Sequence, residues 1–171
     1  HLLWTPSCRP IPRPADDRSA LRDAEDGWGR WARRSHYQGS YREEVVRSLL
    51  VLRLLTDRDT GGIVAAATTS LPEDPGGVRN WDYRFCWLRD AAMTLQALLE
   101  NGYREEAQAW RQWLLRAVAG DPADLQIVYG VDGRRDLTER ELDHLPGYAG
   151  SSPVRIGNAA VGQVQNDVLG E

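Results

Sequence analysis

The chain has 171 residues, of which 42% are hydrophobic and 27% are charged, as in an ordinary globular domain with a sizeable core. The formal net charge is −4, so the chain lacks the excess of basic residues that is typical of nucleic-acid-binding proteins. The same charge gives no electrostatic attraction to acidic membranes. No apolar stretch is long enough to span a bilayer. We therefore expect neither nucleic acid nor membrane as a partner.

Cysteine and histidine usage gives no sign of a metal or redox site. Cys8 and Cys86 fit no metal-binding or redox spacing, and we expect both to be buried free thiols. The three histidines are isolated in sequence, so no metal ion and no cofactor is predicted. No secretory pattern opens the chain, which starts at His1, and we expect a cytoplasmic protein.

The N-terminal third is predicted to be mainly helical. Residues 1–16 predict the end of a strand and a proline-rich connector. Residues 17–34 carry apolar side chains at helical spacing, although two glycines weaken the helix. Residues 41–56 are the clearest helix, since Ser40 and Glu43 match a capping box ahead of an apolar face.

The middle of the chain predicts a helical hairpin. Residues 62–73 fit either a short strand or an extended loop, and residues 74–78 fit a turn. The opening of TDRDTGG resembles a calcium loop, but Thr68 stands where the closing glutamate should be, so calcium is not predicted. Helices are expected over residues 89–100 and 103–119, with the Asn101-Gly102 pair closing the first.

The last third predicts a strand and two helices. Residues 125–129 are β-like, and Thr138 with Glu141 repeats the capping-box pattern. Glu139, Glu141 and Asp143 could supply a carboxylate pair, but we interpret their charge run as a solvated helix face. Residues 156–169 predict a final helix, on which Ala160, Val164 and Val168 share a face.

Residues 80–90, NWDYRFCWLRD, gather aromatic rings and charges just before a predicted helix. A buried strand would favour apolar residues without charges. Sugar sites use both, because hydroxyl groups need donors and acceptors while the apolar face of a pyranose stacks on rings. Arg89 and Asp90 are adjacent, so on a helix we expect no simple pairing between them. The alternative makes Asp90 a helix-end acid and Arg89 a surface charge.

Four stretches of the chain closely resemble bacterial members of glycoside hydrolase family 15. In chain order they are GGIVAAATTSLPE, NWDYRFCWLRD, LQIVYGVDGRRDLTERELDH and GYAGSSPVRIGNAA. That family contains glucoamylases, glucodextranases and trehalases. The resemblance implies a mainly α fold: an incomplete (α/α)6 barrel preceded by the last strand of a β-sandwich. It places the end of the sandwich and a linker in residues 1–16, a connecting helix in 17–38 and the first barrel helices in 39–171.

The resemblance also implies an activity. The family hydrolyses terminal α-linked glucose with inversion, using two glutamates as general acid and general base. The chain has no match to the general-acid motif, and both glutamates are expected beyond Glu171, so no catalytic residue is predicted here. The implied partner is an α-glucoside, either a maltooligosaccharide or trehalose.

The resemblance implies that this chain supplies the wall of the first sugar subsite. Arg89 and Asp90 match the pair that hydrogen-bonds the 4- and 6-hydroxyls of the non-reducing glucose. Tyr83 and Trp87 match aromatic residues that line the same pocket. Arg155 matches a basic position on the next barrel loop.

Two other functions stay open at this point, a stand-alone glucose-binding module and an inactive fragment without catalysis. We favour a partial sequence of the enzyme, because a few helices cannot close a barrel. An evolved module would also have replaced the large apolar helix faces that an open barrel exposes.

Overall fold

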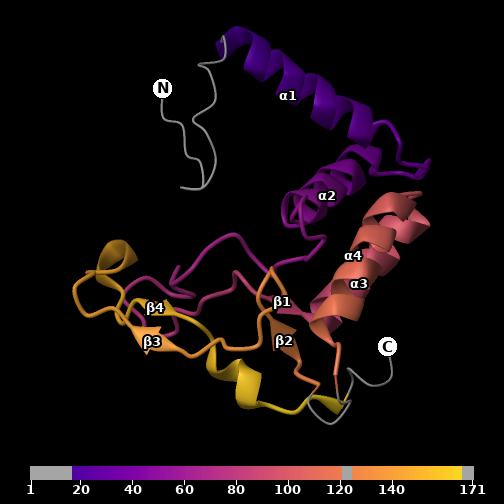
Figure 1. The fold of residues 1–171 in the computed structure, drawn as a ribbon. Coiled ribbons are helices and arrows are strands. Elements are labelled where there is room, and N and C mark those ends of the chain that lie inside the picture. Colours follow the sequence, from indigo (N-terminus) through magenta and orange to yellow (C-terminus); the bar gives the residue numbers. More distant parts are fainter. Residues whose placement is uncertain (1–16, 121–124, 167–171) are drawn as a thin grey trace. The chain divides into compact units, whose positions relative to one another are not determined.

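The computed structural model describes residues 17–120 and 125–166 (Figure 1). The chain divides into two compact units, His1–Ser35 and His36–Glu171. The predicted strand end and connector in residues 1–16 lie outside the described residues, as does Cys8. The assignment of domains to 1–16, 17–38 and 39–171 stays a prediction.

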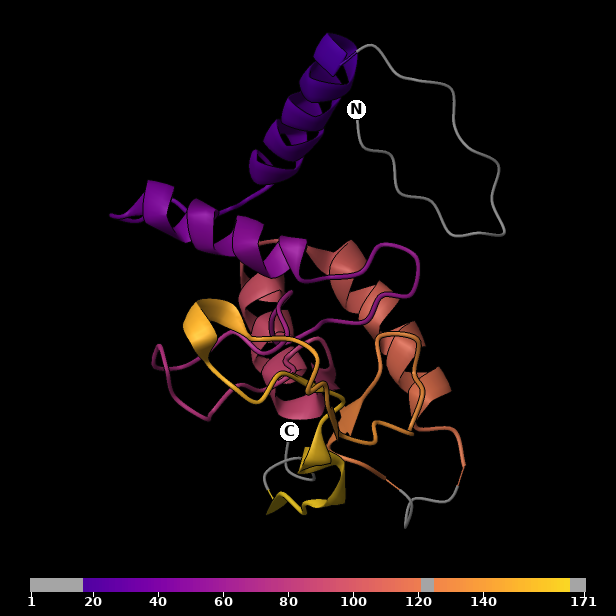
Figure 2. The same ribbon diagram turned by 90° about the vertical axis from the view of Figure 1, so that its left-hand side faces the viewer.

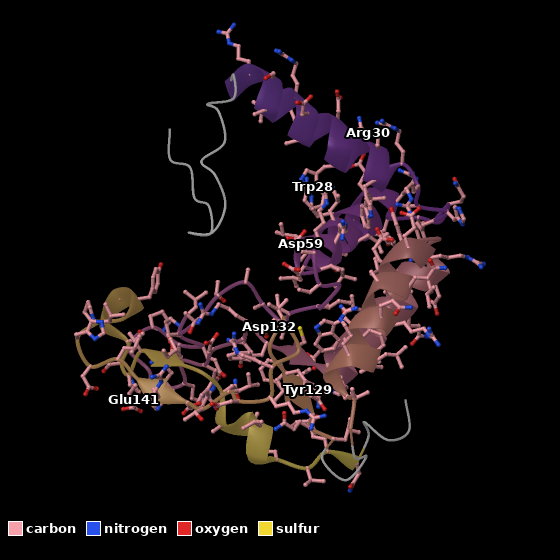
Figure 3. The ribbon with its side chains drawn as sticks, viewed as in Figure 1. Trp28, Arg30, Asp59, Tyr129, Asp132 and Glu141 are labelled. Carbon is pink, nitrogen blue, oxygen red and sulfur yellow. The ribbon has the colours of Figure 1, made fainter. Side chains whose placement is uncertain are left out.

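The first unit contains helix α1, Asp17–Ala32. The helix predicted over residues 17–34 is therefore confirmed to within two residues of its end. Two glycines inside it cost helix propensity but do not interrupt it, because the apolar spacing runs past them. Trp28 and Arg30, which are labelled in Figure 3, both belong to this helix.

The second unit begins with helix α2, Arg42–Leu54, which confirms the predicted helix but not its capping box. The residue before the helix is Tyr41, in a left-handed conformation with φ of 66°, and no side chain caps the helix. The carbonyl oxygen of Tyr41 accepts the first helical bond, from Val45 N at 3.0 Å. Ser40 thus lies one residue too early to reach the free N–H groups.

Helices α3, Leu88–Glu100, and α4, Arg104–Ala117, form the predicted hairpin. They lie side by side in Figures 1 and 2. Gly102, with φ of 94°, makes the turn between them. Its N–H donates to Leu99 O at 3.0 Å, and Tyr103 N donates to Leu98 O at 2.9 Å.

A pair of short strands lies beside this helical hairpin. β1, Cys86–Trp87, pairs antiparallel with β2, Val128–Tyr129. Our view that the charged stretch would not form a buried strand is wrong for these two residues, since both are buried and the charged residues lie on either side. The β-like run at 125–129 contains β2, and residues 62–73 are an extended loop with isolated bridges at Ile63 and Thr69.

The helix start predicted at Thr138 is wrong, because the chain forms β3, Arg140–Glu141, there. β3 pairs antiparallel with β4, Arg155–Ile156. The side chain of Thr138 is engaged with Asp136, whose Oδ1 accepts from its N–H at 3.1 Å and its Oγ1 at 2.6 Å. A hydroxyl held in this turn cannot cap a helix. The solvated helix face assigned to the charge run is therefore wrong as well.

The final helix predicted over residues 156–169 is also wrong where the structure describes it. Ile156 belongs to β4, and the short 3₁₀ turn η3, Ala159–Gly162, follows in place of an α-helix. Residues 163–165 are not helical, and residues 167–169 lie outside the described part. Gly157 breaks the periodicity: its φ is 81°, and a Cβ there would collide with Thr138 O.

The regular structure of the described residues is mostly helical, with four α-helices and two small sheets, and is compatible with part of a family 15 helical barrel. A further 3₁₀ turn, η2, covers Tyr148–Gly150. The complete barrel and the preceding sandwich strand stay predictions. Within the described residues, none of the helices is both long enough and apolar enough to cross a bilayer.

The core behind β1 contains the predicted free thiol of Cys86. It is fully buried in a cluster with Leu88, Trp113, Ala117 and Tyr129. Burial raises the pKa of the Cys86 thiol to about 12, because a thiolate would lose its hydration.

We expect Cys86 to resist alkylation in the folded protein, because its thiol is both inaccessible and protonated. Iodoacetamide labelling followed by peptide mapping should find the Cys86 peptide unmodified at pH 8 and fully modified after unfolding in guanidinium chloride. Mapping separates this peptide from that of Cys8. Rapid labelling of Cys86 without denaturant would contradict the described core.

Candidate functional site

The candidate site is built on residues 80–90, which we call the aromatic segment. On one side its backbone pairs with the loop of residues 62–73: Ala65 N donates to Phe85 O at 2.9 Å, and Ser70 N donates to Trp81 O at 2.9 Å. On the other side Leu88 N donates to Ile127 O at 3.0 Å, next to the β1–β2 pair. The segment is therefore fixed along both edges before it enters α3.

Asp82 is the buried polar centre of the aromatic segment, with no solvent exposure. Its carboxylate accepts from Arg84 Nε at 2.9 Å and Arg84 Nη2 at 2.8 Å, a bidentate pair. It also accepts from the backbone N–H groups of Arg84 at 3.2 Å and Gly157 at 3.1 Å. Every donor that the carboxylate needs is thus supplied by protein.

The ionisation of Asp82 reflects these partners. Burial by itself raises the pKa of the carboxyl group, but the hydrogen bonds from Arg84, the guanidinium charge and the Gly157 N–H outweigh it. The net result is a pKa below the ordinary value of 3.8. The same pairing raises the pKa of Arg84. Asp82 is therefore an anion at neutral pH.

The structure brings Tyr83 and Trp87 together. Their ring centroids lie 6.2 Å apart, with the planes tilted by 47°. Trp87 is only 8% exposed and packs with a core cluster formed by Phe85, Ile127, Val128 and Leu137. Tyr83 is half-buried at the edge of this cluster. Of the two rings, that of Tyr83 offers more surface to a ligand.

Arg89 and Asp90 lie in the first turn of α3 and, against our expectation, do contact each other. Arg89 Nη2 lies 3.4 Å from Asp90 Oδ2, because the long arginine side chain reaches round the helix. Arg89 Nη1 also makes a long hydrogen bond of 3.4 Å to Gln165 Oε1. The side chains of Arg89 and Asp90 are 38% and 43% exposed, so a ligand can reach both.

Arg155 lies at the junction of several loops. It forms ion pairs with Glu139 at 3.5 Å and Glu141 at 3.2 Å, and Glu141 is labelled on β3 in Figure 3. Its Nη1 donates to Val78 O at 2.9 Å, and its guanidinium lies 4.8 Å from the centre of the Trp81 ring. With 14% of the side chain exposed, Arg155 is largely committed to protein partners.

A hollow of about 420 Å³ lies next to Asp82. Its lining is mixed, with an aromatic ring, aliphatic side chains and charges; it includes Arg84, Phe85, Arg134, Asp136, Leu137 and Arg140. Sequence reasoning missed Asp82, Arg84 and Gln165 as members of the site. The alternation of acid, ring and base in DYR was the signal for the first two, because i, i+2 side chains share one face of an extended segment.

The described residues hold no group of three His, Cys, Asp or Glu side chains arranged for a metal ion. In the TDRDTGG stretch, Asp57 Oδ1 accepts from Asp59 N at 3.1 Å, Thr60 N at 2.8 Å and Thr60 Oγ1 at 2.9 Å. This carboxylate is thus turned into its own loop as an Asx turn.

Comparison with known proteins establishes the family of the chain. The sequence profile described as Glycosyl hydrolases family 15 matches residues 39–171. The chain belongs to glycoside hydrolase family 15. No solved structure matches it.

The relatives of this family 15 chain carry the name trehalase. The chain is 45% identical over 160 residues to Trehalase of Thermoplasma acidophilum, covering 92% of this chain and 27% of that protein. It is 40% identical over 174 residues to Trehalase of Mycolicibacterium smegmatis, covering 99% of this chain and 26% of that protein. Trehalase 1 of Sulfolobus acidocaldarius is 47% identical over 131 residues, 75% of this chain and 23% of that protein. The chain thus spans about a quarter of the length of these relatives.

The lowered pKa of Asp82 predicts a contribution to stability that depends on pH. Because the folded-state pKa lies below the ordinary 3.8, the contribution is fully present above pH 3.8 and is lost as pH falls through the folded-state value. Asp82→Asn should lower the unfolding free energy at neutral pH and flatten its decline in acid. Urea unfolding at stepped pH measures both effects.

Asp74→Asn is the matched control for that experiment, because Asp74 is exposed in the turn that precedes the aromatic segment. Its unfolding free energy should stay close to the wild-type curve at neutral pH. An Asp82→Asn variant as stable as wild type at neutral pH would contradict the assigned network.

Proposed function

We propose that the protein containing this chain is an exo-acting, inverting α-glucosidase that releases terminal α-linked glucose, and that its substrate is trehalose. The observation that carries the proposal is the trehalase name of relatives 38–47% identical to this chain. Family membership supports the reaction class. Maltooligosaccharides, the substrate class of the glucoamylases in the resemblance, are the competing substrates.

We propose that this chain supplies the wall of the first sugar subsite. Arg89 and Asp90 support this role because their side chains combine donors and acceptors, lie 3.4 Å apart and are both accessible. The carboxylate of Asp90 would accept from one sugar hydroxyl while the guanidinium of Arg89 donates to its neighbour. We propose the 4- and 6-hydroxyls of the terminal glucose as these partners.

The ring of Tyr83, backed by Trp87, would cover the apolar face of the same glucose unit. Arg155 would contribute from the adjoining loop, where it already holds Trp81, Glu139 and Glu141. We propose that its main effect is to fix the rim of the pocket, with any contact to sugar made by its remaining surface.

The proposed chemistry needs two further carboxyl groups, a general acid and a general base. In inverting glycosidases these stand about 6.5–9.5 Å apart, so that a water molecule fits between base and sugar. We propose that two glutamates outside this sequence supply them. The wall residues would then act by holding the glucose so that its anomeric carbon faces that water.

Product analysis with the full-length protein tests the reaction. Hydrolysis of trehalose with inversion yields one α-glucose and one β-glucose, because only the attacked anomeric carbon changes configuration. Early time points followed by NMR distinguish this from retention, which yields α-glucose alone. A protein that hydrolyses maltose but not trehalose would overturn the substrate, and one that hydrolyses neither would overturn the function.

Asp90→Asn and Arg89→Ala in the full-length protein should each lower kcat/KM for trehalose about 10- to 100-fold. Each removes a charge-assisted hydrogen bond to the sugar, worth about 1.5–3 kcal/mol. Folding should be nearly unchanged because both side chains are accessible. Steady-state kinetics and a melting curve check the two expectations.

Glu43→Gln is the matched control, because Glu43 is likewise an acid in the first turn of a helix, α2. It should lower stability slightly through the helix dipole and leave kinetics intact. If Asp90→Asn behaves as Glu43→Gln does, Asp90 is a helix-end acid and the proposed sugar contact is wrong.

A further inference from the structure

The feature that carries a further inference is the position of Asp82 between Trp81 and Tyr83. Among the described residues, its carboxylate accepts four hydrogen bonds, all from Arg84 and Gly157. A fold that needed only packing at this point could use an apolar residue, because burying a charge is costly even when it is paired.

Asp82 is also fixed through its backbone. Its carbonyl oxygen accepts from Asn158 Nδ2 at 2.9 Å, and its backbone bridges to Thr69 in the opposite loop. Asp82 is therefore held by two segments, one near residue 69 and one at residues 157–158. A shift of the carboxylate would break its bond to Gly157, and a shift of the backbone would break contacts to both segments.

Fixing Asp82 also fixes the direction of the rings on either side. In an extended segment successive side chains point to opposite faces, and the burial follows this rule, since Asp82 is buried while Trp81 and Tyr83 are half-buried. Trp81 is held against Arg155 at 4.8 Å, and Tyr83 against Trp87 at 6.2 Å. The buried side chain of Asp82 thus determines the direction in which the rings of Trp81 and Tyr83 point.

We infer that Asp82 is a positioning residue for the sugar-binding wall. Its buried carboxylate determines the position of the Tyr83 ring, because it joins Arg84 to the backbone of Gly157. This inference rests on the proposed function and deepens it. Asp82 does not touch the sugar; it acts through Tyr83, the accessible ring of the wall.

An asparagine at position 82 would have nearly the same side-chain shape as Asp82, but it could not accept all of the hydrogen bonds that the carboxylate accepts. The amide nitrogen is a donor, and it would face two donors: Arg84 N and Nε at the place of Oδ1, or Arg84 Nη2 and Gly157 N at the place of Oδ2. These two donors would lose their acceptor, and the segment would shift to restore it. The ring of Tyr83 shifts with it.

The test is a double-mutant cycle in the full-length protein with trehalose as substrate. Asp82→Asn should lower kcat/KM at least about tenfold, the effect of losing even one hydrogen bond to a charged group. Tyr83→Ala should also lower it. The double variant should be only slightly worse than Tyr83→Ala, because the effect of Asp82 passes through that ring.

Asp132→Asn is the matched control. Asp132 likewise accepts from an arginine two residues on, Arg134, but its carboxylate is exposed at the surface and lies outside the hollow's lining. It should leave kcat/KM near the wild-type value and combine additively with Tyr83→Ala. Lower stability of Asp82→Asn is expected in either case, so the cycle decides: a purely structural role for Asp82 predicts losses of kcat/KM that multiply with those of Tyr83→Ala.

Normal kcat/KM in Asp82→Asn, or multiplying losses in the cycle, would overturn the inference. If Asp82→Asn does not fold, Arg84→Lys replaces it, because Lys retains the charge at the surface but cannot make the bidentate pair. The same coupling to Tyr83 is then expected, and its absence overturns the inference. Wild-type protein inactive on every α-glucoside would instead refute the proposed function, and the inference with it.

Discussion

A carboxylate without access to water must find all of its hydrogen-bond donors inside the protein, and this constraint on Asp82 organises the candidate site. The donors come from Arg84, two residues away, and from Gly157, seventy-five residues away. A local extended segment and a distant loop are thereby locked in one register. The residue at position 157 must also be glycine, because a Cβ on this backbone would collide with Thr138 O.

Polar and charged side chains fix the neighbouring loops in the same way. Ser70 Oγ donates to Arg155 O and accepts from Arg155 N, both at 2.6 Å, so one hydroxyl replaces a missing strand partner. The guanidinium of Arg155 then reaches β3 through Glu141. The helical hairpin and these loops therefore differ in what stabilises them. The helices bury apolar surface, whereas polar side chains determine the geometry of the loops that carry the aromatic rings and charges of the candidate site.

Much of the helical part of the fold could be predicted from the sequence. Helices α1 to α4 were predicted because apolar residues recur at helical spacing, and that pattern depends on no distant partner. The capping boxes failed because a local pattern cannot show where a hydroxyl is engaged. Ser40 lies one residue before the cap, and Thr138 is bonded to Asp136.

The site was predictable only in part, for the same reason. The crowding of rings and charges pointed to residues 80–90, and the resemblance to family 15 pointed to Tyr83, Trp87, Arg89, Asp90 and Arg155. The contact of Arg89 with Gln165 and that of Asp82 with Gly157 join residues about 75 positions apart. Periodicity and spacing carry no information on such pairs, and they do not reveal that the adjacent side chains of Arg89 and Asp90 contact each other.

The central claim is that the aromatic segment, with Arg89 and Asp90 at its end, is the wall that holds a terminal glucose. The most direct measurement is a crystal structure of the full-length protein with a non-hydrolysable trehalose analogue. The account predicts Arg89 nitrogen and Asp90 oxygen atoms about 2.7–3.2 Å from the 4- and 6-hydroxyls of the terminal ring, with Tyr83 against its apolar face. A sugar bound elsewhere, with Arg89 and Asp90 touching only protein, would contradict it.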